Sequence, residues 1–96
     1  MNDDFFALPP FKPADALLQL KRQLRELRPL AERGEGFEWQ GQAVVALQAA
    51  EGRIDARLAK RPARSPDWEP HALATAADVR RFVVLVKARL RHWTDD

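Results

Sequence analysis

The sequence predicts an all-α fold: a three-helix bundle preceded by an extended N-terminal tail rich in aromatic residues and proline. Apolar residues recur at spacings of three and four in three separate segments, as they do along one face of a helix. We identify no run that alternates apolar and polar residues, and the chain lacks the Asn-Gly and Asp-Gly pairs typical of hairpin turns. With 96 residues, 46% of them hydrophobic and 31% charged, the chain suits one globular domain.

Composition excludes several classes of protein. The chain has no cysteine, which rules out disulfides and thiolate metal sites. Its longest purely apolar run, Phe82 to Val86, is far shorter than the roughly 20 residues of a membrane span. The acidic start, Asn2-Asp3-Asp4, does not resemble a secretory signal. We therefore expect a cytoplasmic protein.

Residues 1–12 form the predicted tail, and residues 13–96 the predicted single domain. The tail carries Phe5, Phe6 and Phe11, and its Pro9-Pro10 pair favours an extended chain. Three phenylalanines are costly to leave in water. We therefore expect the tail to pack on the domain, and the alternatives are disorder and docking in the groove of a partner protein.

The first helix is predicted over residues 13–33. Pro13 suits a first helical turn, and Pro29 predicts a kink, because its ring clashes with the preceding turn. Gly34 and Gly36 then predict a turn. The apolar stripe of this helix consists of Leu17, Leu20, Leu24, Leu27 and Ala31.

The second helix is predicted over residues 37–60. Gly41 and Gly52 fall inside it, and each would cost about 1 kcal/mol relative to alanine. The apolar stripe consists of Ala43, Leu47, Ala50, Ile54 and Leu58. The next segment, residues 61–70, contains three prolines and predicts a connection, which Trp68 would pin to the bundle.

The third helix is predicted over residues 75–93. Thr75 followed by Asp78 is a variant of the capping box, although a start near Pro70 is the competing interpretation. The apolar stripe consists of Val79, Phe82, Val83, Val86, Leu90 and Trp93.

The centre of this third helix carries the leading functional hypothesis. It is apolar all round, so Val84, Leu85 and Ala88 would face away from the bundle. They are half-exposed, covered by the tail, or covered by another protein chain. We therefore expect a non-enzymatic protein–protein interaction module, whose partner is a second copy or an unidentified protein. The expected contact residues are Val84, Leu85, Ala88, Phe5, Phe6 and Phe11.

Nucleic-acid binding is the alternative. Five cations near the end of the second helix (Arg53, Arg57, Lys60, Arg61 and Arg64) are accompanied by one acid, Asp55. The third helix carries five cations and no acid between Val79 and Trp93. Such clusters are typical of phosphate-binding surfaces, although no helix-turn-helix pattern accompanies them. The candidate contact residues are Arg57, Arg61, Arg80, Lys87 and Arg91.

No residues predict catalysis. Neither His71 nor His92 belongs to a metal-ligand motif such as His-Glu-x-x-His, and Ser65, the only serine, lies in a proline-rich segment. We therefore expect no enzyme activity, no cofactor and no bound metal.

Overall fold

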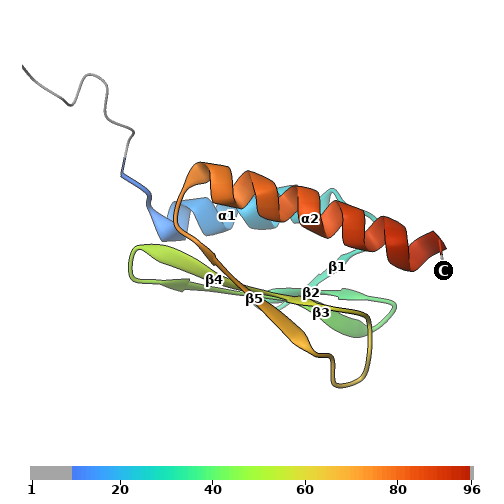
Figure 1. The fold of residues 1–96 in the computed structure, drawn as a ribbon. Helices are drawn as coiled ribbons and strands as arrows, with labels where there is room; N and C mark the ends of the chain where they lie inside the picture. The colour runs from blue at the N-terminus through green and yellow to red at the C-terminus, as the bar shows by residue number, and fades with distance from the viewer. Residues whose placement is uncertain (1–9, 96) are drawn as a thin grey trace, which may run out of the picture.

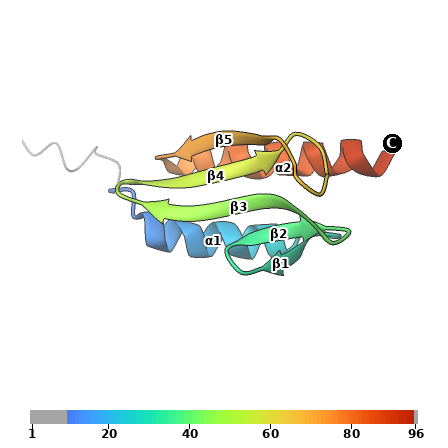
Figure 2. The same cartoon turned by 90° about the horizontal axis from the view of Figure 1, so that it is seen from below.

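The computed structural model, which describes residues 10–95, shows an α/β fold in place of the predicted three-helix bundle. Five antiparallel strands follow one another across a single sheet in the order β1-β2-β3-β4-β5. Both helices lie on one face of this sheet, side by side (Figures 1 and 2). The elements are α1 (Pro13–Arg25), β1 (Ala31–Arg33), β2 (Gly36–Trp39), β3 (Gln42–Ala50), β4 (Arg53–Ala59), β5 (Trp68–Leu73) and α2 (Ala76–Asp95).

Helix α1 begins at Pro13, as predicted, and the leucines of its stripe face the core. Leu17, Leu20 and Leu24 are buried. The helix ends at Arg25, however, so the predicted extension to residue 33 and the kink at Pro29 are wrong. Pro29 follows a cis peptide bond in the connection, and residues 31–33 form the edge strand β1. A proline that ends the helical pattern thus marks a boundary rather than a bend.

The predicted second helix is also wrong, because residues 37–60 contain strands β2, β3 and β4 in place of a helix. Gln40 and Gly41 form the two-residue loop between β2 and β3, with φ angles of 53° and 81°. Two positive φ angles are what the turns of tight hairpins require. Gly52, with a φ of 74°, serves the loop between β3 and β4. The glycines that would weaken a helix therefore make the turns of a sheet.

Strand β4 alternates between apolar and polar residues, which the helical prediction misses. Ile54, Ala56 and Leu58 are buried beneath the helices. The side chains that alternate with them, Arg53, Asp55 and Arg57, point to the other face of the sheet. A period of two over only seven residues is easily mistaken for part of a longer helical pattern, because several core residues also fit spacings of three and four.

The segment predicted as a connection is partly a strand. The connection covers residues 60–67, and β5 begins at Trp68. Pro70 lies in this edge strand. Its missing N–H therefore does not interrupt the hydrogen bonds between strands in the middle of the sheet.

Helix α2 begins at the predicted cap rather than near Pro70. The Thr75 hydroxyl accepts a hydrogen bond from the N–H of Asp78 at 3.0 Å. The Asp78 carboxylate accepts one from the N–H of Ala74 at 3.0 Å, and this bond is the main cause that lowers the pKa of Asp78. All six residues of the predicted apolar stripe are buried, which confirms the inward face of this helix.

The hydrophobic core lies between the helices and one face of the sheet. Among its fully buried side chains are Leu20, Leu24, Phe37, Ile54, Leu58 and Val86. Neither helix of the described part of the chain is long and apolar enough to cross a membrane.

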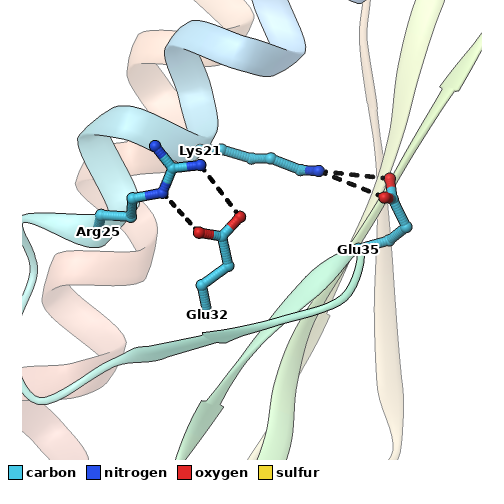
Figure 3. A network of polar contacts seen from close by, with 4 residues as sticks. All are labelled: Lys21, Arg25, Glu32 and Glu35. Carbon is cyan, nitrogen blue, oxygen red and sulfur yellow. Dashed lines mark hydrogen bonds and ion pairs between the residues drawn. The ribbon is translucent and has the colours of Figure 1, made fainter.

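Two ion pairs hold the β1–β2 hairpin against α1 (Figure 3). Arg25 binds Glu32 at 2.5 Å, and Lys21 lies 3.4 Å from Glu35. The hydrogen bond from Arg25 is the main cause that lowers the pKa of Glu32. Since each pair has one side chain at least half exposed to solvent, we expect the two pairs to orient the hairpin rather than to supply much of the stability.

Candidate functional site

The face of the sheet turned away from the helices is the candidate functional site. Neither helix covers this face, which Figure 2 shows in front of the helices. We call it the open face. Strand alternation and register place on it Arg33, Gly36, Glu38, Ala46, Gln48, Asp55, Arg57, Trp68, Pro70 and Ala72.

A trough of about 1290 Å³ runs over the open face. Gly36, Ala46 and Ala72 contribute to its lining, and their small side chains leave the space that larger ones would fill. Gly36 is also required for packing, because a Cβ atom there would overlap the carbonyl oxygen of Val45 in the neighbouring strand. A ligand in this trough can therefore approach the backbone of the sheet closely.

Charges on the open face are only partly neutralised. Arg53 binds Asp55 at 2.7 Å, and Arg33 lies 3.6 Å from Glu38. Arg57 has no such carboxylate among the described residues. Its guanidinium carbon lies 5.6 Å from the ring centre of Trp68, which is a cation–π contact. Arg57 thus keeps its charge available to a ligand beside an aromatic ring.

The loop between β4 and β5 adds further cations at this end of the open face. The N–H of Lys60 donates to the carbonyl oxygen of Asp67 at 2.9 Å, which closes the loop directly beside Trp68. Lys60, Arg61 and Arg64 are exposed, and no ion pair involves them within residues 10–95. We call the group formed by Arg57, Lys60, Arg61, Arg64 and Trp68 the basic end.

A polar network on the helix side of the sheet supports the position of β5. Arg89 of α2 donates to Glu69 at 3.0 Å and to the carbonyl oxygen of Ala59 at 3.0 Å. Glu69 also lies 2.9 Å from His71, and hydrogen bonds to His71 and then Arg89 lower the pKa of Glu69. The His71 ring packs edge-on against Phe82, with centroids 5.5 Å apart. Arg89 and His71 therefore join β5, which begins at Trp68, to α2.

Among residues 10–95, the residues predicted to contact a protein partner differ in their exposure to solvent. Val84 is 63% exposed and Ala88 is exposed on the outer side of α2. Leu85 is partly buried against the core, and so is Phe11. Phe5 and Phe6 lie outside the described residues.

The residues predicted to contact nucleic acid are divided between the two layers of the fold. Arg57 and Arg61 belong to the basic end, on the sheet side. The others (Arg80, Lys87 and Arg91) are exposed on α2. The sequence predicts for Trp68 only that it pins a loop, and its place beside Arg57 becomes visible once β4 and β5 are paired. The alternation of apolar and polar residues along β4 could have revealed this site. It places Arg57 on the open face, just before the cations of the loop.

The described residues contain no group of three or more His, Asp or Glu side chains placed to hold a metal ion. Comparison with known proteins adds no candidate. The chain matches no known family, and no curated protein or solved structure is significantly similar to it.

Proposed function

We propose that the protein is a non-enzymatic binding protein that holds single-stranded nucleic acid on its open face. The observation that carries the proposal is the basic end. Arg57 contacts the partly buried Trp68, and three more cations without ion-pair partners among the described residues lie in the adjoining loop, next to a trough across an uncovered sheet.

The chemistry of the basic end suits a single strand. Unpaired bases expose their flat faces, which stack on aromatic rings and on planar guanidinium groups. Trp68 and Arg57 offer one surface of each kind, 5.6 Å apart. The exposed cations of the loop then suit the phosphates of the same strand.

The shape of the open face favours a single strand over a duplex. The major groove of DNA admits a helix or a two-stranded ribbon, whereas a broad five-stranded face does not enter it. The small side chains along the trough, Gly36, Ala46 and Ala72, would allow bases to lie close to the sheet.

Substitution at the basic end is expected to weaken binding of a labelled single strand of about 12 nucleotides. Trp68→Ala should lower affinity about 5- to 100-fold, because one stacked base is lost. Because Trp68 also packs against the core, Arg57→Gln serves as the second variant, since Arg57 is exposed and its loss removes the stacking guanidinium without opening the core. Arg61→Gln and Arg64→Gln together should also reduce the slope of log K against log salt by about 0.7 for each phosphate contact removed. Fluorescence anisotropy over a range of salt concentrations measures both effects.

Arg22→Gln and Arg80→Gln provide matched controls, since both arginines are exposed on the helices, away from the open face. Circular dichroism confirms that each variant is folded. Equal losses in the controls and the basic-end variants would contradict the proposal, as would absence of binding by the wild-type protein at low salt.

Association with a second copy of the chain is the second candidate function, and the exposure of α2 favours it. Val84 is 63% exposed, with the small residue Ala88 one turn further along the same outer face. Val84→Asp is then expected to shift a concentration-dependent dimer towards monomer in sedimentation experiments. Leu85→Asp is unsuitable, because Leu85 packs against the core and its loss would also disturb folding. A wild-type protein that is monomeric at all concentrations would exclude this candidate.

A further inference from the structure

A second hollow, of about 310 Å³, lies on the helical layer, apart from the open face. It opens between the chain that leaves α1 and the last turns of α2, where the two helices run side by side in the same direction (Figure 1). Its lining consists of Leu27, Arg28, Lys87, Leu90, Arg91, Thr94 and Asp95.

Three cations of different origin converge on this hollow. Arg28 belongs to the connection after α1, whereas Lys87 and Arg91 lie one turn apart on α2. In the part of the chain that the structure describes, no ion pair involves any of the three. Asp95 is the only acid among the described residues of the lining, so positive charge predominates.

Lys87 and Arg91 lie one helical turn apart, where like charges repel each other. The dipole of α2 attracts cations only within its last turn, which begins after Arg91. Lys87 lies roughly two turns before the end of α2, beyond the reach of that effect. A multivalent anion would relieve the repulsion among all three side chains.

Apolar side chains also border the hollow. Leu27 and Leu90 contribute to its lining, and Leu90 is only 6% exposed. Arg28, Lys87 and Arg91 are themselves exposed, so the charges of all three are accessible to a ligand from solution. A phosphate group brings up to two negative charges and three acceptor oxygens, which match two arginine forks and one ammonium group.

We propose that the hollow between the connection after α1 and the end of α2 binds a phosphate group, contacted by Arg28, Lys87 and Arg91. The ligand is either a free phosphate or phosphomonoester, or a phosphate of a nucleic-acid strand that is also held at the basic end. The site itself does not depend on the proposed function of the open face, because none of its residues belongs to the basic end.

Titration with inorganic phosphate at constant ionic strength, followed by NMR, tests the site. The amide signals of Leu27, Leu90 and Thr94 are expected to shift and to saturate. Lys87→Gln and Arg91→Gln should each weaken phosphate binding about tenfold, the loss typical of one charge-assisted hydrogen bond. Arg80→Gln is the matched control, because Arg80 is exposed on the same helix but does not line the hollow.

Three results would overturn the inference. They are the absence of saturating shifts, equal shifts with chloride, and an equal loss of phosphate binding in the Arg80→Gln control. Oligonucleotide titration of the Arg91→Gln variant then identifies the source of the phosphate. Weakened oligonucleotide binding assigns the phosphate to the strand, whereas unchanged binding assigns it to a small phosphate ligand. If the wild-type protein binds no oligonucleotide, the proposal for the open face fails and the inorganic phosphate result still decides this one.

Discussion

Replacing Leu20 by alanine is expected to lower the free energy of unfolding by about 2–5 kcal/mol, a large part of the stability of a domain of this size. The Leu20 side chain is 0% exposed and lies in the core between α1 and the sheet. Its truncation removes buried apolar surface and leaves a cavity that the surrounding strands can fill only in part. Unfolding in urea, followed by circular dichroism, measures the change.

Leu18→Ala is the matched control, with the same substitution two residues earlier on the same helix. Leu18 is 62% exposed, so its change in unfolding free energy should stay within about 0.5 kcal/mol. Both variants alter helix propensity equally, which isolates the contribution of burial. Similar losses at both positions would contradict the packing of α1 on the sheet.

Gly36→Ala is expected to destabilise the protein by about 1–3 kcal/mol, because the added Cβ atom overlaps a backbone carbonyl in β3. Backbone cannot move aside as a flexible side chain can, so β2 and β3 must separate locally. The size of this effect distinguishes the folds. In a three-helix bundle, Gly36 would occupy an open turn, and the same substitution would cost little.

Gly34→Asn separates this clash from the general cost of replacing glycine. Gly34 has a φ of 58°, a backbone conformation that asparagine tolerates, and a Cβ atom added there would meet no other atom within 4 Å. Hydrogen exchange should show faster opening of β1 and β2 in Gly36→Ala than in Gly34→Asn. Equal protection in the two variants would contradict the close approach of β2 to β3.

The two helices could be predicted because their signals are local. The leucine stripe of α1 and the apolar stripe of α2 both identify buried faces correctly, and the cap formed by Thr75 and Asp78 locates the start of α2. These features depend on residues within one or two turns of each other.

The helical prediction for the middle of the chain is wrong because its composition favours helices. Strand β3 contains alanine at four positions, and alanine is the strongest helix former. Its hairpin turns use Gln40-Gly41 and Glu51-Gly52, which lack the usual asparagine or aspartate before glycine. Pairing with β2 and β4 then overrides the intrinsic preference of the segment.

The candidate site, too, could be predicted from the sequence only in part. The charge cluster from Arg53 to Arg64 is visible in the sequence, but the contact of Arg57 with Trp68 exists only because β4 pairs with β5. Likewise, Arg28 lies in the connection after α1, and only the tertiary structure brings it to the same hollow as Lys87 and Arg91 of α2.

Local sequence is sufficient to specify the inward faces of both helices, the cap of α2 and the excess of cations after residue 52, since each depends on neighbouring residues. Tertiary pairing was needed to establish that residues 31–73 form a sheet and which cations share a surface. Strand pairing forms backbone hydrogen bonds between segments that are distant in sequence. The sequence of a short apolar run does not indicate which other segment will be its neighbouring strand.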